Sequence, residues 1–296
     1  MLNYPALLPI LALMLNALVW GSSWWPLRQL QTRGLHPLWA TVFIYLLAVA
    51  LIATLRPRAL GQLLRTPALW VLVCASGFTN AAFNWAVVIG DVVRVVLLFY
   101  LMPLWAVLLA RWLLHEPLSR PAALRVGLAL AGAAIVLWPT GGTGAWPLPR
   151  ALPDWLGLLG GFSFALNNVM LRREAAQPEE ARALAMFVGG AAVAGTLAAL
   201  LASQGRLAWP PAPAAGWVAI ALALATLFLL SNLTLQFGAA RLPAHVTSVV
   251  MLSEVVFASG SAIALGGGRL SASLLLGGGL IVSAALLAGL GRTDGG

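Results

Sequence analysis

The sequence contains no lysine and few acidic residues. Of its 296 residues only 8% are charged, and 17 basic side chains face 8 acidic ones, which gives a formal net charge of +9. A soluble globular domain carries about 25% charged residues, so this chain has too few charges to cover a surface that faces water. Hydrophobic residues make up 61% of the sequence. These proportions predict an integral membrane protein.

Other absences narrow the function. The single cysteine, Cys74, excludes a disulfide within the chain. No nucleotide-binding loop, metal-ligand spacing or catalytic triad pattern is present, so we expect no cofactor, no metal and no enzymatic activity. The excess of Arg could indicate nucleic-acid binding. Because these residues lie in short loops between apolar runs, we interpret them as topology signals and expect no nucleic-acid partner.

Apolar runs of membrane-spanning length predict ten transmembrane helices. The expected helices cover residues 7–27, 37–55, 68–89, 92–114, 122–139, 154–172, 182–203, 214–238, 243–265 and 271–290. The first run has no basic residue before it and no small-residue cleavage site, so we expect it to be a retained helix rather than a signal peptide.

The fold class that follows is an all-α integral membrane protein with two five-helix inverted repeats around a central cavity. The first repeat is expected at 1–139 and the second at 154–296, joined by a linker loop at 140–153. An even number of helices places both termini on one side. With both termini in the cytoplasm, the cytoplasmic loops hold more Arg residues than the outer loops, as the positive-inside rule requires.

Weak internal similarity supports the repeat. Asn80 aligns with Asn232 and Asn84 with Gln236, at the same spacing along the chain. Secondary carriers are commonly built from such repeats, with the substrate site between them near the midplane. The same comparison pairs the first helix with the sixth, although that match alone is weak.

Polar and aromatic side chains inside the apolar runs are the candidates for a substrate site. On the third helix Ser76, Asn80 and Asn84 recur every four residues, which places them on one face. The side chains expected to line the cavity are Asn16, Trp20, Ser23, Trp24, Thr79, Asn80, Phe83, Asn84, Tyr100, Trp105, Ser163, Phe164, Asn167, Ser231, Asn232 and Gln236. Alternatively, the amides and hydroxyls hold helices together, and the rings only fill space.

Glu254 is the one acidic residue well inside a predicted helix. Intramembrane carboxyl groups serve proton relays in many transporters, so Glu254 is a possible coupling residue. A single carboxyl is a thin basis for a relay, and the sequence favours substrate flow down its own gradient. Small residues such as Gly132 and the run at 277–279 are expected to form seams between closely packed helices.

Two stretches carry a resemblance to a known family. The first reads LMPLWAVLLA at 101–110 and EPLS at 116–119; its second copy reads SEVVFA at 253–258 and GRLS at 268–271. Together they resemble the repeat signature of the drug/metabolite transporter (DMT) superfamily, EamA type. Gly268 stands where that family usually has an acid. Within the superfamily, the Trp-rich first helix and the Asn-bearing third helix are most similar to the YddG aromatic amino acid exporters.

The resemblance implies export of small metabolites across the bacterial inner membrane, by a chain that works as a monomer in the lipid bilayer. The expected substrates are amino acids, including aromatic ones, or similar amphiphilic metabolites. A multidrug or cationic-solute exporter is the first alternative; it would need an acid in the cavity, and the first helix offers Asn16 instead. A lipid-modifying enzyme would need clustered His and acidic groups, and only His115 with Glu116 come near.

Overall fold

The computed structural model describes residues 4–113, 120–138, 148–174, 176–239, 250–251, 253–266, 268 and 271–290. Every regular element in these ranges is helical, as the sequence predicts. The first half contains α1 (Tyr4–Ser22), α2 (Trp24–Thr32), α3 (Pro37–Leu55), α4 (Arg58–Arg65), α5 (Pro67–Ile89), α6 (Val92–Phe99), α7 (Met102–Leu113) and α8 (Arg120–Leu137). The second half contains α9 (Leu152–Arg173), α10 (Glu179–Ser203), α11 (Ala215–Ala239), α13 (Ser253–Ala264) and α14 (Ala272–Leu290).

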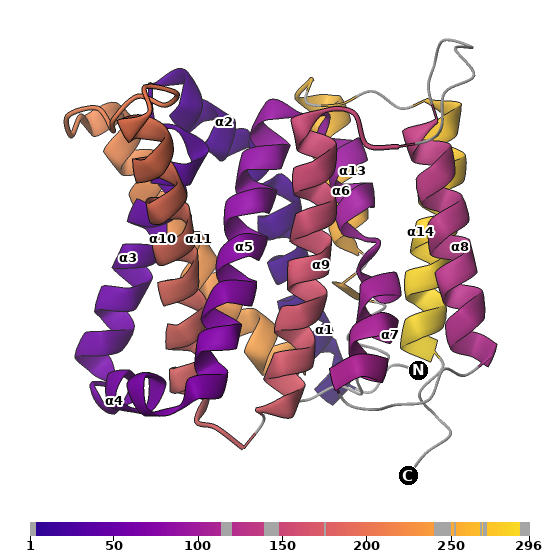
Figure 1. Ribbon diagram of the computed structural model, residues 1–296, viewed down its shortest axis with the longest axis horizontal. Coiled ribbons are helices and arrows are strands. Elements are labelled where there is room, and N and C mark those ends of the chain that lie inside the picture. The colour runs from indigo at the N-terminus through magenta and orange to yellow at the C-terminus, as the bar shows by residue number, and fades with distance from the viewer. Residues whose placement is uncertain are drawn as a thin grey trace.

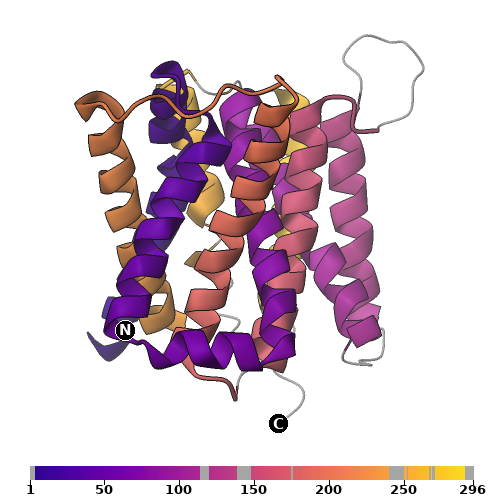
Figure 2. The ribbon, with the colours of Figure 1, turned by 60° about the vertical axis from the view of Figure 1, so that its left-hand side comes forward.

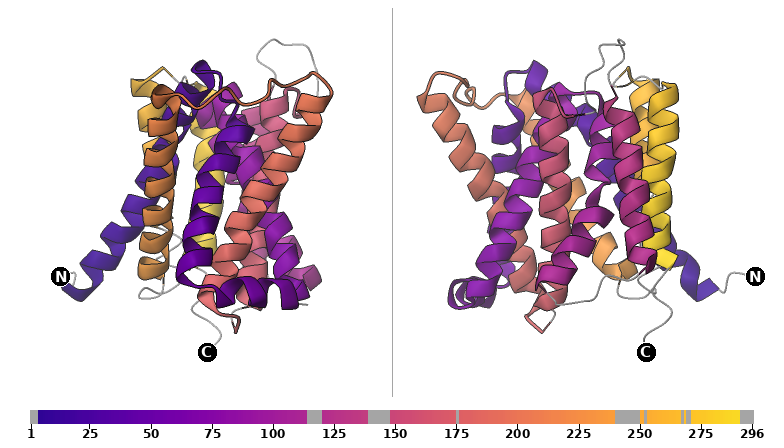
Figure 3. Two further views of the ribbon diagram at one scale, coloured as in Figure 1. Left: turned by 90° about the vertical axis from the view of Figure 1, so that its left-hand side faces the viewer. Right: turned by 45° about the vertical axis from the view of Figure 1, so that its right-hand side comes forward.

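The long helices stand side by side in one bundle, and their directions alternate in the order in which they follow along the chain (Figure 1). We call the end of the bundle at which α1 starts and α14 finishes the lower end, and the opposite end, where α3 starts, the upper end (Figure 3). Helices of the two halves are interleaved: α10 packs between α3 and α5, while α1 packs against α11 and α13. The interior of the bundle is therefore built by both halves together.

Five described segments are long and apolar enough to cross a membrane by length and composition. They are Leu7–Thr32, Pro37–Leu55, Pro67–Ile89, Glu179–Ser203 and Ala215–Leu235, and shorter apolar helices lie at Val126–Val136, Ser253–Ala264 and Ala272–Ala284. Each of the ten predicted ranges contains at least part of a described helix. The count of ten spanning helices and their division into two repeats remain predictions.

Two of the predicted continuous helices are broken. The first range divides at Ser23, whose hydroxyl donates to the Trp20 carbonyl (2.8 Å), and α2 continues to Thr32, beyond the predicted end. The fourth range divides at Tyr100 and Leu101, between α6 and α7. A proline follows each break, Pro26 in the first turn of α2 and Pro103 in that of α7. Because proline lacks the N–H that a continuous helix would need there, it favours a new helix start.

A short helix, α4, was not predicted. It lies across the lower end of the bundle, between α3 and α5 (Figure 2). Ala59 and Leu63 are buried, whereas Leu60 and Leu64 are exposed, and Arg residues stand at both ends of the helix. Basic ends with exposed Leu are typical of helices at a membrane interface.

The upper end of α3 is capped by a histidine. The ring nitrogen Nδ1 of His36 accepts the Leu38 N–H (3.2 Å). Burial lowers the pKa of His36 to about 4, because the charged imidazolium loses its hydration. The ring is therefore neutral at pH 7, and its Nδ1 lone pair remains available for the cap.

Glycines form the predicted seam between α8 and α14. A Cβ on Gly132 would lie 2.5 Å from the Gly277 carbonyl oxygen, and a Cβ on Gly277 would lie 2.6 Å from the Gly132 carbonyl oxygen. Both contacts are with backbone, which cannot move aside as a flexible side chain could. Gly127, five residues earlier on α8, has nothing within 4 Å of its Cβ position.

We expect Gly132→Ala to destabilise the protein and Gly127→Ala to leave it unchanged or slightly more stable. At position 132 the added methyl forces two helix backbones apart, and such overpacking costs about 1–3 kcal/mol. At position 127 only the helix preference for Ala operates. Thermal melting of the two purified variants in the same detergent measures the difference. Equal melting temperatures would show that the seam tolerates a wider spacing.

Candidate functional site

A cavity lies in the centre of the bundle. Its volume is about 120 Å³, counted as the space open to the centre of a water-sized sphere. Because one water needs about 10–15 Å³ of such space, the cavity holds several waters or a small solute. Its wall is formed by Asn16, Trp20, Tyr45, Ser76, Thr79, Asn80, Phe83, Phe99, Phe164, Asn167, Met186, Phe187, Phe228, Asn232, Leu235, Met251 and Glu254.

The wall contains nine of the seventeen residues predicted for the site. They are Asn16, Trp20, Thr79, Asn80, Phe83, Phe164, Asn167, Asn232 and Glu254. They come from α1, α5, α9, α11 and α13. Asn80 and Asn232, which the internal repeat predicts to be equivalent, both line the same cavity, one from each half of the chain.

One amide joins the two halves beside the cavity. The amide nitrogen of Asn16, on α1, donates to the Ser231 carbonyl oxygen (2.8 Å) and also to the Ser231 hydroxyl (2.7 Å), on α11. A carbonyl oxygen can only accept, so this contact fixes which way the amide points. The Asn16 Oδ1 atom is left buried without a hydrogen-bond partner.

A second polar chain connects α3, α5 and α10. The Tyr45 hydroxyl donates to Asn80 Oδ1, and Asn80 Nδ2 donates to the Ser76 carbonyl oxygen (2.8 Å). The Ser76 hydroxyl in turn donates to the Met186 carbonyl oxygen (3.1 Å). The Thr79 hydroxyl donates within α5, to the Ala75 carbonyl oxygen (2.8 Å). The hydrogen-bond donors of this side of the wall are thus spent on the protein itself.

Glu254 is buried in the wall opposite this chain. Its side chain lies in the first turn of α13, and the residue is 8% exposed. The hydroxyl of Tyr100, located at the break between α6 and α7, donates to Glu254 Oε2 (2.9 Å) and lies 3.3 Å from the Met251 carbonyl oxygen. Among the described residues no basic side chain pairs with this carboxyl group. The coupling role of Glu254 stays a prediction.

Aromatic rings cover the upper side of the cavity. Trp20 of α1 stacks on Phe228 of α11 with ring centroids 4.5 Å apart and planes 12° apart. Phe99 contacts Phe83 at 4.9 Å and Phe164 at 5.3 Å. These rings come from both halves of the chain, so the cavity has an apolar, flat-sided roof above its polar wall.

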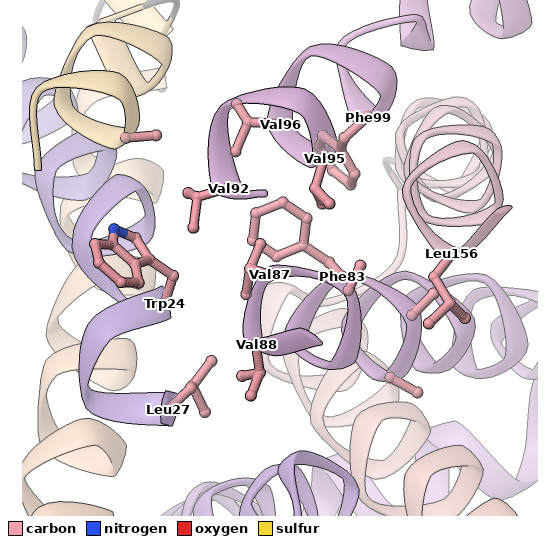
Figure 4. Close-up of a cluster of buried hydrophobic side chains, with 14 of the residues drawn as sticks. Trp24, Leu27, Phe83, Val87, Val88, Val92, Val95, Val96, Phe99 and Leu156 are labelled. Atoms are coloured by element: carbon pink, nitrogen blue, oxygen red, sulfur yellow. The ribbon is translucent and has the colours of Figure 1, made fainter. Parts of the chain in front are cut away.

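Above the roof the bundle is closed by a dense apolar cluster. Phe83 of α5 lies against the valines of α6, and Trp24 and Leu27 approach from α2 (Figure 4). Contacts between the halves reinforce this region. Trp24 Nε1 donates to the Ser261 hydroxyl (2.9 Å), and Arg94 pairs with Asp154 (2.7 Å). The structure is therefore closed above the cavity.

Seven of the predicted cavity residues lie outside the wall, each for an identifiable reason. The Ser23 hydroxyl donates to the Trp20 carbonyl oxygen, and Trp24 Nε1 donates to the Ser261 hydroxyl, as described above. The Asn84 amide donates to the Thr41 hydroxyl (2.9 Å) and is fully buried. The remaining residues are behind or beside the wall. Tyr100 donates a hydrogen bond to Glu254, and Ser231 accepts one from Asn16. Ser163 is buried in α9, and Trp105 packs edge-on against Phe162.

Some positions remain outside the described part. The side chain of Gln236 is not described, and His115, Glu116 and His245 also lie outside the described residues. Several wall residues were not predicted from the sequence: Tyr45, Phe99, Met186, Phe187, Leu235 and Met251. Tyr45 is one of only three tyrosines in the chain, and a hydroxyl in the middle of an apolar run was the signal that could have identified it.

Comparisons with known proteins agree with the helical architecture. Residues 7–138 match the EamA-like transporter family, which confirms the EamA-type resemblance for this part of the chain. No curated protein matches the chain. One solved crystal structure aligns with 97% of this chain and 98% of its own length, with a TM-score of 0.59 and 21% sequence identity. At that identity the likeness concerns the fold alone.

The matched family consists of transporters rather than enzymes. This finding agrees with the expectation that the chain is not an enzyme, and with its apolar helices it identifies a multi-pass membrane protein. The lipid bilayer is the partner that such a protein implies.

Proposed function

We propose that this protein is a secondary transporter that exports amino acids, including aromatic ones, or similar small amphiphilic metabolites across the cytoplasmic membrane. The observation that carries the proposal is the central cavity, where buried amides from both halves meet a stacked aromatic pair. Polar groups inside a membrane are costly unless they face protein or water, so their concentration around one cavity supports a path for a polar solute.

The proposed mechanism is alternating access between two five-helix inverted repeats, at 1–139 and 154–296. A solute enters the cavity from the lower end, and its flat apolar part lies under Trp20 and Phe228 while its polar part contacts the amide wall. The repeats then rock against each other, so that the contacts above the roof open and the lower side closes. Similarity to the YddG aromatic amino acid exporters, noted in the sequence, supports the choice of substrate.

The distribution of Arg supports a cytoplasmic lower end with both termini inside. Described arginines near the lower end are Arg56, Arg58, Arg65, Arg111, Arg120, Arg173 and Arg182, and those near the upper end are Arg28, Arg33, Arg94, Arg150 and Arg206. The excess at the lower end follows the positive-inside rule. In this orientation the upper closure separates the cavity from the outside, and the structure represents a state closed to the outside.

The test of the proposed function is uptake in lipid vesicles. Purified protein is reconstituted and a panel of labelled amino acids is offered, with protein-free vesicles as the blank. Transport of phenylalanine and tryptophan above the blank supports the proposal. A protein that moves no amino acid of the panel, yet melts cooperatively, would contradict it.

A second test addresses the shared cavity. In a Cys74→Ser background, we expect single Asn80→Cys and Asn232→Cys variants to react with a small water-soluble thiol reagent in membranes. Tryptophan should slow both reactions, because both positions line the same cavity. The control is Ala194→Cys, at a fully buried position away from the wall, which should react slowly. Reaction at neither cavity position, or at only one, would argue against a shared hydrated cavity.

A further inference from the structure

We propose that the cavity selects its solute by a protonated amine, which pairs with Glu254, and that the solute needs no carboxylate. The preferred substrates are then arylalkylamines, compounds with a flat ring on a short chain that ends in an ammonium group. This inference rests on the proposed function, because it names the substrate class of the same cavity. It also reverses an argument from the sequence, which discounted cationic solutes because the first helix carries no acid.

The charge balance of the wall is the first observation. Glu254 is the only charged residue among the described residues of the wall, and its described contact is the hydrogen bond from the Tyr100 hydroxyl. A buried carboxylate without a cationic partner is unfavourable, so the site is completed when a cation enters. No described wall residue is basic, so the carboxylate of an amino acid finds no counter-charge there.

The balance of hydrogen-bonding groups points the same way. The donors of Asn16, Ser76, Thr79, Asn80 and Tyr45 are all used on protein acceptors. The Oδ1 atoms of Asn16 and Asn167 are enclosed by protein and have no hydrogen-bond partner among the described residues. Both residues are 2% exposed or less. The five donor residues therefore offer the carboxylate of a solute no free hydrogen-bond donor.

The third observation is the aromatic surface of the cavity. Trp20 and Phe228 present parallel planes, and Phe99 and Phe164 lie beside them in the same cavity. Ring faces attract cations as well as flat apolar groups. An ammonium group with N–H bonds donates to the Glu254 carboxylate, whereas a quaternary ammonium has no N–H bond to donate. The combination therefore favours a primary arylalkylamine over a quaternary cation.

The experiment uses four probes that share an indole ring. Tryptamine carries only the amine, tryptophan carries amine and carboxylate, indole-3-propionate carries only the carboxylate, and trimethylated tryptamine carries a charge without an N–H bond. Calorimetric titration of the full-length protein in lipid nanodiscs gives each Kd. We expect tryptamine to bind at least tenfold more tightly than tryptophan and trimethylated tryptamine, and indole-3-propionate to show no binding.

Two variants test the residue assignment. Glu254→Gln should weaken tryptamine binding at least tenfold, whereas Glu174→Gln, which removes an acid in the turn between α9 and α10, should leave every Kd unchanged. If Glu254→Gln does not fold, the four probes on the unmodified protein still test whether the cavity selects the amine. Tighter binding of tryptophan or indole-3-propionate than of tryptamine would overturn the inference, and so would a folded Glu254→Gln variant with an unchanged tryptamine Kd.

Failure of the inference and failure of the proposed function give different results. If tryptophan is transported in vesicles and binds as well as tryptamine, the protein exports amino acids and only the amine selectivity is wrong. If no indole compound binds and no amino acid is transported, the proposed function itself is wrong. Tight binding of trimethylated tryptamine, equal to that of tryptamine, would identify a general site for lipophilic cations and reject the role of the N–H donors.

Discussion

Replacement of Trp20 by Ala is expected to lower the transport of aromatic amino acids at least tenfold, with a much smaller effect on alanine or serine. Trp20 lies in the cavity wall and stacks on Phe228 with centroids 4.5 Å apart. Loss of a stacking ring removes both apolar area and an aromatic contact worth about 0.5–1.5 kcal/mol beyond that area. Small amino acids do not use this surface, so their transport should change little. Uptake rates of labelled phenylalanine and alanine in the same vesicles measure the ratio.

Two other tryptophans provide matched controls. The sequence predicted Trp24 and Trp105 for the same role, but neither lies in the wall. Trp105→Ala should leave the phenylalanine-to-alanine ratio unchanged, because its ring packs against Phe162 away from the cavity. Trp24→Ala should lower the transport of all substrates by the same factor, because Trp24 belongs to the closure above the roof. Equal losses for both substrates in Trp20→Ala would mean that its ring serves packing alone.

The sequence predicted the polar positions of the cavity better than their partners. Asn80 and Asn84 have the same spacing and the same residue type, yet only Asn80 lines the cavity. Asn84 lies one turn higher on α5, where the Thr41 hydroxyl is near enough to accept its amide. Helical periodicity gives the face on which a side chain lies. It does not give the neighbouring helix that the face meets at each height, because that depends on tertiary packing.

The helix breaks show a similar limit of prediction from the sequence. Hydropathy predicted one continuous apolar helix over 92–114, since both α6 and α7 are apolar. Pro103 follows the break, and its missing N–H favours a new helix start there. The break places Tyr100 where its hydroxyl reaches Glu254, 154 positions further along the chain. A contact of this separation follows from the packing of the two halves, which a single sequence does not specify.

The ion pair between Arg94 and Asp154 should hold the upper end closed, and its removal should shift the protein toward a state open to the outside. Arg94 Nε lies 2.7 Å and Arg94 Nη2 3.0 Å from the two carboxylate oxygens, and Nη1 donates to the Val136 carbonyl oxygen (2.6 Å). One side chain therefore connects α6, α8 and α9. The Asp154 side chain is only 6% exposed, so it cannot regain full hydration when its partner is removed. Hydrogen bonds to charged groups are worth about 1.5–3 kcal/mol, which corresponds to a change of roughly tenfold to a hundredfold in the ratio of closed to open states.

We expect Arg94→Gln to raise the reactivity of a Phe83→Cys reporter toward a membrane-impermeant thiol reagent added from outside, at least tenfold, in the Cys74→Ser background. Phe83 belongs to the roof of the cavity and is 5% exposed, so the reporter should react slowly while the upper end is closed.

The control is Arg33→Gln, which removes an exposed side chain whose hydrogen bonds stay within its own helix, and it should leave the reporter unreactive. The double variant Arg94→Gln with Asp154→Asn should recover part of the closure, because it no longer leaves a buried carboxylate unpaired. An unreactive reporter in a well-folded Arg94→Gln variant would show that the apolar cluster above the roof holds this end closed without the ion pair.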